Sequence, residues 1–370
     1  MKQKKSFWIS LFVAGACILA GLACIYVGHI LGGHKNMTLI DDRNMITVNH
    51  DAEGDFDRIR IDVIAANVEL IPSEDEKCHV ITKDSEYVEY TVYVVEDTLM
   101  IRATDTRAWY ERLFTGSVSD RSVEVALPRE EYKSLDVKTV SGRVNVNVRY
   151  TFSEDVTLTS TSGTIGTAAA ISGHLEMYAT SGNLYARGFL NTVTARCVSG
   201  KISLGGKTVD GDCTVASADL ETTSGSIVVT KATLQSLTAQ TGSGSVIFED
   251  LAVNEAISAE TTSGSIRMNR VTCDSLNAET TSGRIKLTDT VASGHIRAKT
   301  GSGAIRLERA DAASLSLRTT SGSVTGSLAT PKVFYTDTTS GSVDVPKSTE
   351  GGLCEIKTTS GSIRLTIEAE

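Results

Sequence analysis

From about residue 135 onward the chain repeats one pattern of apolar and polar positions. The position three residues after each repeated Ser-Gly dipeptide is always aliphatic, and positions six and four before it are mostly apolar. The position three before it is mostly polar, as expected for strands with one buried face. Most steps are 19 or 20 residues, and the dipeptides begin at Ser141, Ser162, Ser181, Ser199, Ser224, Ser243, Ser263, Ser282, Ser302, Ser321, Ser340 and Ser360.

The repeat predicts two short strands joined at a Ser-Gly corner. The apolar alternation changes parity across Ser-Gly, so the chain must bend there, and we expect Gly because it tolerates the dihedral angles of such a bend. Variable segments such as 269–275 are expected to be turns. One repeat has too few aliphatic side chains to be stable alone, whereas stacked repeats bury each column on itself. The predicted fold class is therefore all-β, a parallel β-solenoid of 19–20-residue coils.

The pattern extends backwards in weaker form. Residues 56–71 match one coil if Ala65-Ala66 stands in place of Ser-Gly. Strands are expected at 79–83, 87–95, 98–103 and 122–127. The loop 104–121 contains Trp109, Tyr110, Leu113 and Phe114, which we expect to cover the end of the core, although a loop that contacts a membrane or a ligand is the alternative.

The first residues have a different character. Three lysines (Lys2, Lys4 and Lys5) precede an apolar run at 7–31 that is long enough for one transmembrane helix. The positive-inside rule predicts a single-pass cell-membrane protein with a cytoplasmic N-terminus and an extracellular C-terminal domain. A cleaved signal peptide, or a lipoprotein cut at Cys24, is the alternative. The expected domains are 1–34 (cytoplasmic tip and anchor), 35–128 (atypical coil and cap) and 129–370 (repetitive solenoid).

Charge and cysteine content narrow the function classes. Of 36 basic residues three belong to the N-terminal run, which leaves 33 against 45 acidic residues, a net charge of −12. Such a surface is expected to repel nucleic acid. The seven cysteines form no CxxC pair, and the five beyond residue 31 have irregular spacing, so we expect small buried hydrophobes rather than a disulfide framework.

The sequence resembles a known family at this point. Residues 59–72 (IRIDVIAANVELIP), 98–103 (TLMIRA), 123–128 (VEVALP), 134–146 (SLDVKTVSGRVNV) and the TTSGSI repeats are similar to the bacterial putative-adhesin family of unknown function, which includes LiaG-like membrane proteins. The resemblance covers roughly residues 45–370 and implies a β-solenoid ectodomain on a cell surface. It implies no catalytic residues.

No catalytic, cofactor-binding or metal-binding residues are predicted. The histidines are scattered, and His174 and His295 lie in strand-like contexts. A glycan-active lyase or hydrolase is the enzymatic alternative, because Glu221, Glu260 and Glu279 share the column three before Ser-Gly. Lys299 and Arg318 continue this column, which favours a surface ladder of ion pairs.

Two further kinds of ligand, a calcium ion and ice, are suggested by other parts of the sequence. The insertion 204–219 carries Asp210, Asp212 and Asp219, which could bind Ca²⁺ but complete no calcium-loop pattern, so a surface loop is favoured. A threonine column suggests ice binding, but Gly242 and Gly301 interrupt it; its members are Thr223, Thr262, Thr281, Thr320, Thr339 and Thr359.

The predicted function is non-enzymatic. The chain is expected to be a membrane-anchored, extracytoplasmic binding or scaffold protein, adhesin-like or associated with envelope stress. Its partners would be an unknown surface glycan or envelope protein and the membrane, with a possible contact through the C-terminal solenoid edge at 361–370. We expect Arg364, Glu368 and Glu370 to guard this edge against self-association.

Overall fold

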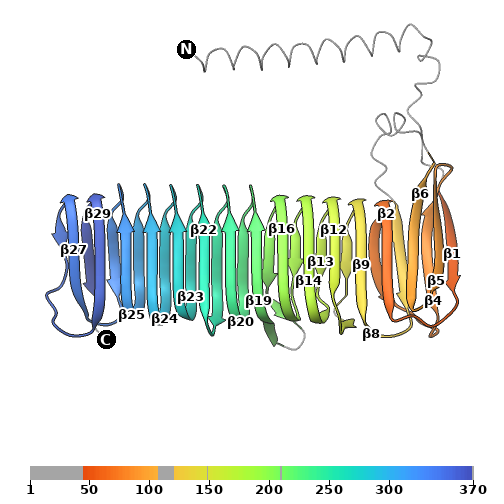
Figure 1. Cartoon of the computed structure of the whole chain (residues 1–370), viewed down its shortest axis with the longest axis horizontal. Helices are drawn as coiled ribbons and strands as arrows, with labels where there is room; N and C mark the ends of the chain where they lie inside the picture. The colour runs from red at the N-terminus through yellow and green to blue at the C-terminus, as the bar shows by residue number, and fades with distance from the viewer. Residues whose placement is uncertain (1–44, 107–120, 148, 209–210, 369–370) are drawn as a thin grey trace, which may run out of the picture. The chain divides into compact units, whose positions relative to one another are not determined.

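The computed structural model describes residues 45–106, 121–147, 149–208 and 211–368. This part of the chain is all-β and forms a parallel β-solenoid of about 12 turns, as predicted (Figure 1). Residues 1–44 lie outside it, and so does the expected transmembrane helix; within it no helix is long and apolar enough to span a membrane. The loop residues from Trp109 to Phe114 also lie outside the described part.

The strands follow in the order β1 (Ile46–Ala52), β2 (Arg58–Ala65), β3 (Asn67–Pro72), β4 (Cys78–Asp84), β5 (Val88–Val95), β6 (Thr98–Asp105), β7 (Ser122–Leu127), β8 (Glu131–Tyr132), β9 (Ser134–Ser141), β10 (Val144–Val146), β11 (Thr151–Phe152), β12 (Val156–Ser162), β13 (Ile165–Thr167), β14 (Ala170–Ser181), β15 (Leu184–Ala186), β16 (Phe189–Ser199), β17 (Ile202–Gly205), β18 (Lys207–Thr208), β19 (Gly211–Thr222), β20 (Ile227–Thr241), β21 (Val246–Val253), β22 (Ala256–Thr261), β23 (Ile266–Thr280), β24 (Ile285–Thr300), β25 (Ile305–Thr319), β26 (Val324–Leu328), β27 (Lys332–Ser340), β28 (Val343–Asp344), β29 (Gly352–Ser360) and β30 (Ile363–Ile367).

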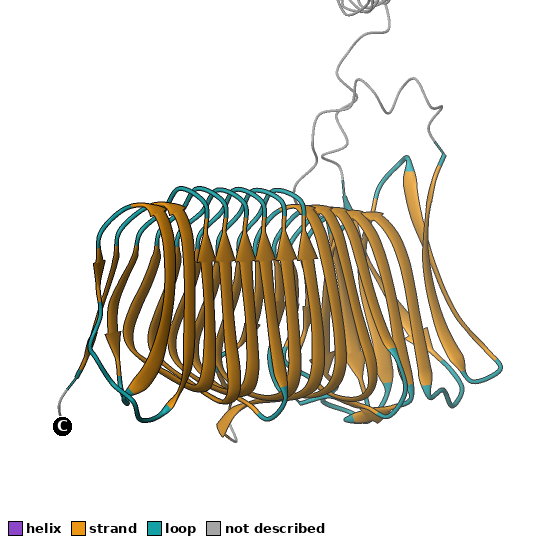
Figure 2. Ribbon diagram, turned by 60° about the vertical axis from the view of Figure 1, so that its left-hand side comes forward, coloured by secondary structure: helices purple, strands orange, loops and turns teal. Residues whose placement is uncertain are grey.

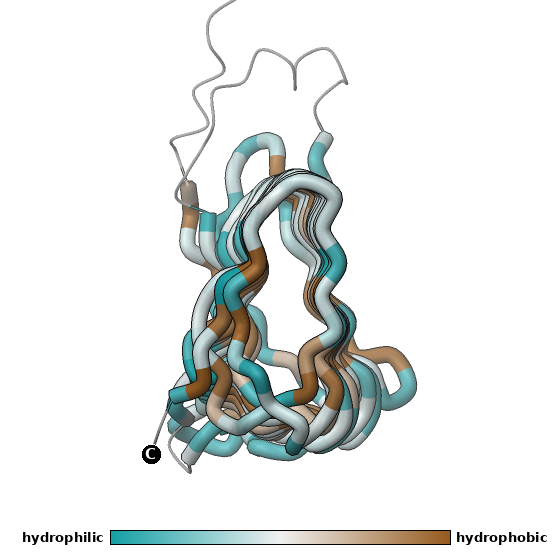
Figure 3. Tube along the Cα trace, turned by 90° about the vertical axis from the view of Figure 1, so that its left-hand side faces the viewer, coloured by the Kyte–Doolittle hydropathy of each residue, from teal (hydrophilic) through white to brown (hydrophobic). Residues whose placement is uncertain are grey.

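Each coil has three sides rather than two strands and a turn. In β20, side A (227–230) ends at Lys231, side B (232–235) follows, and side C (237–241) leads to the next Ser-Gly corner. The expectation of a turn at 269–275 was wrong, because β23 runs through this segment and buries Val271 and Cys273. In an end-on view the coils superimpose around one interior (Figure 3).

The predicted apolar columns line this interior. On side A the residue three after Ser is buried in every coil except at Val343, which is 44% exposed. The column six before Ser stacks in register, for example Leu237 on Ile257 and Ile257 on Leu276. Parallel ladders therefore place each aliphatic side chain on its equivalent in the next coil.

The Ser-Gly corners stack as a row of loops along one edge (Figure 2). The dihedral argument for Gly was wrong here, because Gly142 is the one glycine of the twelve dipeptides with a left-handed φ. Space decides instead: a Cβ on Gly244 would lie 1.6 Å from the carbonyl oxygen of Gly225, one coil earlier. Backbones approach so closely at this corner that no other side chain fits.

A buried threonine two residues before Ser satisfies the corner's polar groups. Thr280 Oγ1 donates to the carbonyl of Gly264 in the preceding coil at 3.1 Å and accepts from the amide of Gly283 in its own coil at 3.0 Å. The same donor bond recurs at Thr241, Thr261, Thr300, Thr319 and Thr358. Since buried polar groups need partners, this ladder explains why the repeat reads Thr-Thr-Ser-Gly.

The corner between sides A and B is a second ladder that the sequence pattern did not reveal. In five successive coils its residues have left-handed φ angles of 46° to 56° although none of the five is Gly, and their charges alternate in sign along the stack: Lys231, Asp250, Arg270, Asp289 and Arg309. Arg270 pairs with Asp250, and Arg309 Nη2 lies 2.5 Å from Asp289 Oδ1. Left-handed backbone costs about 1–2 kcal/mol per residue, so the stack must impose it.

At its N-terminal end the solenoid closes with antiparallel strands. Coil β2–β3 matches the degenerate coil predicted at 56–71, because Ile59 pairs with Leu135, and Ala65 lies beside Ser141. It is not outermost: β6 and β7 lie parallel to β2 and β3 on their outer side. Strands β5 and β4 then pair antiparallel with β6 and β7, and β1 pairs with β4.

At the C-terminal end the last two coils lie in reversed order. On side C strand β29 is inserted between β25 and β27, and on side A strand β30 lies between β26 and β28. Figure 1 shows β27 outside β29. The threonine hydrogen bonds give the same order of coils. Thr358 donates to Gly322 O at 3.2 Å, whereas Thr338 donates to Gly361 O at 3.3 Å.

The expectation that residues 361–370 form the exposed edge was therefore wrong. Strand β30 has a neighbour on each side, Arg364 Nε lies 3.5 Å from Asp344 Oδ2, and Ser327 donates to Glu368 Oε1 at 2.9 Å. Glu370 lies outside the described residues. The edge belongs to β27 and β28, which explains the exposure of Val343.

Candidate ligand-binding groove

The predicted charge column on side C is a ladder of surface ion pairs. Arg196 Nε lies 3.3 Å from Glu221 Oε2, Lys299 pairs with Glu279, and Arg318 lies 3.2 Å from Glu355. Glu260 lies between Gln240 and Glu279 in register. A hollow of about 440 Å³ over Gly242 brings Glu221, Glu260 and Glu279 to one open surface.

The other candidate residues lie apart from one another. His174 donates its backbone amide to Asp155 at 2.8 Å, and His295 is exposed on β24. Asp212 belongs to the β18–β19 hairpin, Asp219 pairs with Arg196 at 3.4 Å, and Asp210 lies outside the described residues. The threonines weighed for ice binding form an exposed row beside the Ser-Gly corner.

The five described cysteines are buried and free, as expected from their spacing. Burial raises the pKa of the Cys354 thiol to about 12 and that of Cys213 to about 11. A thiol whose pKa lies this far above neutral pH stays protonated, and a protonated thiol is a weak nucleophile. They serve as small packing residues.

A further hollow, which the sequence analysis did not identify, lies on side A near the N-terminal end. The outward column there reads Glu69, Asn145, Gly166, Tyr185 and Ser203 on β3, β10, β13, β15 and β17. Gly166 leaves a gap between the larger side chains of the strands on either side. Two hollows of about 480 and 320 Å³ meet at Asn145 and together form what we call the side-A groove.

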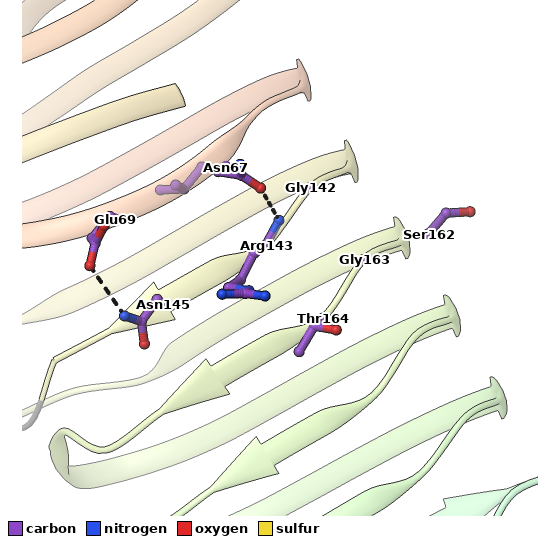
Figure 4. Close-up of a pocket in the computed structure, with 9 residues that line it drawn as sticks. Asn67, Glu69, Gly142, Arg143, Asn145, Ser162, Gly163 and Thr164 are labelled. Carbon is purple, nitrogen blue, oxygen red and sulfur yellow. Dashed lines mark hydrogen bonds between the residues drawn. The ribbon is translucent and has the colours of Figure 1, made fainter. Parts of the chain in front are cut away.

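Hydrogen bonds between coils fix one end of this groove. Asn67 Oδ1 accepts from the backbone amide of Arg143 at 2.8 Å, and Asn145 Nδ2 donates to Glu69 Oε1 at 3.4 Å. Figure 4 shows these side chains projecting from neighbouring strands, with Thr164 on the next coil. Because the strands are locked in parallel ladders, the polar groups are held in place before any ligand arrives.

A family model described as Toastrack DUF4097 matches residues 56–189 and 185–366, which include every strand of the side-A groove. The chain belongs to this Toastrack family. The finding confirms the resemblance to the putative-adhesin family of unknown function. No curated protein matches the chain.

Several solved structures are similar to this Toastrack chain over most of their length. A putative adhesin from Bacteroides fragilis is 13% identical, with 88% of this chain and 98% of that chain covered and a TM-score of 0.32. A putative lipid binding protein from Parabacteroides distasonis is 16% identical, with 87% and 97% covered and a TM-score of 0.33. A putative adhesin from the same species is 14% identical, with 85% and 97% covered and a TM-score of 0.34. Likenesses this distant do not identify a ligand.

Two arginines border the side-A groove of the Toastrack chain. Arg143 precedes β10, and Arg187 follows β15, so they lie on opposite flanks of β13. Both are exposed, and among the described residues neither guanidinium has an ion-pair partner. Lys201, beside Asn183, is also without one there.

The arrangement suits binding by hydrogen bonds. Amide, hydroxyl and guanidinium groups line an open slot beside the ring of Tyr185, which is 39% exposed. A tyrosine gives rigid, amphipathic contact area at little entropic cost. The signal that could have revealed the groove was the change from large to absent side chains in one outward column, at Gly166.

Proposed function

We propose that this Toastrack protein is a membrane-anchored, extracytoplasmic binding protein that holds an extended surface polymer, a glycan, in the side-A groove. The observation that supports the proposal is the groove itself: Asn67, Arg143, Asn145 and Tyr185 surround a floor in which Gly166 has no side chain. The repetitive ectodomain and the apolar run at 7–31 fit a protein that displays this groove outside the cell.

A glycan suits the groove because of its shape and chemistry. The groove is shallow and open along the sheet, so the middle of an extended polymer can lie in it and no chain end has to be threaded in. Its walls offer both donors and acceptors, which hydroxyl-rich ligands need. Rigid ladders carry these groups, so little conformational entropy is lost when the polymer binds.

The acidic hollow on side C favours binding of a glycan over its cleavage. Glu221 and Glu279 are each paired with a cation on an open face, as a structural ladder requires. A glycan-active enzyme needs one carboxyl group kept as an acid and another as a base or nucleophile.

The test uses the full chain in detergent, titrated with a panel of soluble cell-surface and plant glycans. Gly166→Trp fills the groove, and a Cβ at this position meets only Val144 O at 3.9 Å, so the backbone tolerates the change. Thr325→Trp, in the same outward column on β26, is the matched control.

We expect wild type and Thr325→Trp to bind a common glycan, and Gly166→Trp to lose it. Equal binding by Gly166→Trp, or no binding to any glycan by wild type, would overturn the proposal. New reducing ends or unsaturated products in the same mixtures would replace it with the enzymatic alternative.

A further inference from the structure

We infer that the side-A groove selects an anionic polymer, whose carboxylate or phosphate groups are held by Arg143 and Arg187. The inference rests on the proposed function and adds the chemical class of the ligand. Because the net charge of the chain is negative and would repel an anionic polymer, the attraction must come from the groups at the groove itself.

The first step is the distribution of paired and unpaired cations. Several arginines elsewhere on the solenoid contact carboxylates, as Arg196 contacts Asp219 and Glu221 and Arg309 contacts Asp289, whereas others, such as Arg267 and Arg284, have no ion pair among the described residues. In the described structure Arg143, Arg187 and Lys201 make no such contact, although acidic residues outnumber basic ones in the chain. Arg143 and Arg187 differ from the other unpaired arginines in that both line the side-A groove, where Glu69 is the one carboxylate among the described lining residues, so the groove keeps a small excess of positive charge.

The second step is the chemistry of the two arginines. A guanidinium presents a planar fork of donors that matches a carboxylate or a phosphate with two parallel hydrogen bonds. Arg143 and Arg187 are both exposed, so their forks are accessible to a ligand.

The third step is the spacing. Arg143 and Arg187 lie two coils apart across the sheet and four residues apart along it, which corresponds to roughly 16 Å between their backbones. Asn145 and Gly166 lie between them in register. An extended polymer with repeated charges can meet both forks at once, with its chain lying over Asn145 and Gly166.

Glu69 sets a limit at one end of the groove. It lines the hollow next to Arg143 and accepts from Asn145 Nδ2 at 3.4 Å. A second acidic residue, Glu124 on β7, pairs with Glu69 in register. These carboxylates repel an anionic chain, so the bound polymer runs from Arg143 toward Arg187 and away from β3.

The experiment measures binding of three soluble polymers of similar length to the full chain by calorimetry: an oligogalacturonate (carboxylate), a polyglycerol phosphate (phosphate) and a neutral cello-oligosaccharide. Arg143→Gln/Arg187→Gln is compared with Arg267→Gln/Arg284→Gln. The control arginines are also on side A, exposed and without an ion pair among the described residues.

We expect at least one charged polymer to bind wild type more tightly than the neutral one, with an affinity that falls as salt rises. The Arg143/Arg187 double variant should lose about tenfold or more in affinity, because charge-assisted hydrogen bonds disappear, while the Arg267/Arg284 variant stays close to wild type. The polymer that binds identifies carboxylate or phosphate as the anion.

Three results would overturn the inference. If the neutral polymer binds as well as the charged ones, the groove is a glycan site without charge selection, and the proposed function stands alone. If both double variants lose affinity equally, diffuse surface charge is responsible and the groove is not selective. If none of the polymers and none of the panel glycans binds, the inference and the proposed function both fail.

Discussion

Lys332 and Asp311 form a buried ion pair across an inserted strand. Lys332 Nζ lies 2.6 Å from Asp311 Oδ1, and the two side chains are 5% and 19% exposed. Thr330 bridges them, because it accepts from Lys332 at 2.6 Å and donates to Asp311 at 2.9 Å. The pair links β27 to β25, although β29 separates these strands on side C. It therefore holds the outer coil over the C-terminal one.

Removing the lysine should destabilise this end of the solenoid. Lys332→Met leaves the Asp311 carboxylate without its cation, and breaking a buried pair costs about 3–5 kcal/mol. Lys299→Met removes the exposed partner of Glu279 and should cost about 1 kcal/mol or less. Chemical unfolding of both variants gives the comparison. Equal losses would mean that the Lys332 pair contributes no more than a surface pair.

The reversed order of the last coils can be tested with cysteine pairs. Arg318 lies opposite Lys357, and Lys357 lies opposite Asp337. Neighbouring rungs are about 4.8 Å apart, which suits a disulfide, whereas rungs two apart are not bridged. Arg318→Cys/Lys357→Cys should therefore cross-link on oxidation, and Arg318→Cys/Asp337→Cys should not.

Peptide mapping by mass spectrometry identifies the bond, since the described native cysteines are buried. The opposite result, with residues 318 and 337 cross-linked, would restore the sequential order of coils.

The sequence predicted the columns but not this order, for a physical reason. Each coil presents the same inward positions, so Leu315 packs as well on Phe334 as on Cys354. Periodicity alone cannot distinguish the two stacks. The deciding contacts, such as Lys332 with Asp311, join residues that have no place in the repeat.

The candidate site was hidden for a related reason. Repeats draw attention to what recurs, whereas the side-A groove arises where a side chain is missing, at Gly166, and where cations lack partners, at Arg143 and Arg187. The corner ladder from Lys231 to Arg309 was missed because left-handed backbone is uncommon at residues other than Gly. Stacking imposes that conformation, and a single repeat gives no sign of it.

The threonine ladder makes a prediction about two adjacent residues. Thr280→Val removes the donor to Gly264 O and the acceptor for Gly283 N, and leaves both backbone groups buried without this partner. We expect a loss of about 1–3 kcal/mol in the free energy of unfolding. Thr281→Val changes an exposed neighbour and should alter it by less than about 0.5 kcal/mol. Similar values for the two variants in urea denaturation would remove the structural reason for the buried threonine.

The N-terminal end should be sensitive to pH through His79. Its Nδ1 lies 2.7 Å from Asp51 Oδ1 across the β1–β4 ladder, and its Nε2 lies 2.8 Å from Asp75 Oδ1. The hydrogen bond with Asp51, followed by that with Asp75, raises the pKa of His79 above 6.5. The bond with His79 in turn lowers the pKa of Asp75. Because the folded protein binds the imidazole proton more tightly, this stabilisation is complete below about pH 6.5 and disappears as pH rises through the folded pKa.

The melting temperature of wild type should therefore exceed that of His79→Gln most clearly near pH 6, and the gap should narrow toward alkaline pH. Asp75 also stabilises the folded protein near pH 6, because the stabilisation that its carboxylate contributes is lost only as pH falls through its lowered pKa. Asp51→Asn removes the partner that contributes most, and should bring the His79 titration, followed by NMR of the imidazole, closer to that of a free histidine. A wild-type His79 that titrates at or below pH 6.5 would show that the two carboxylates do not hold its proton, and the pH dependence of this end would then need another origin.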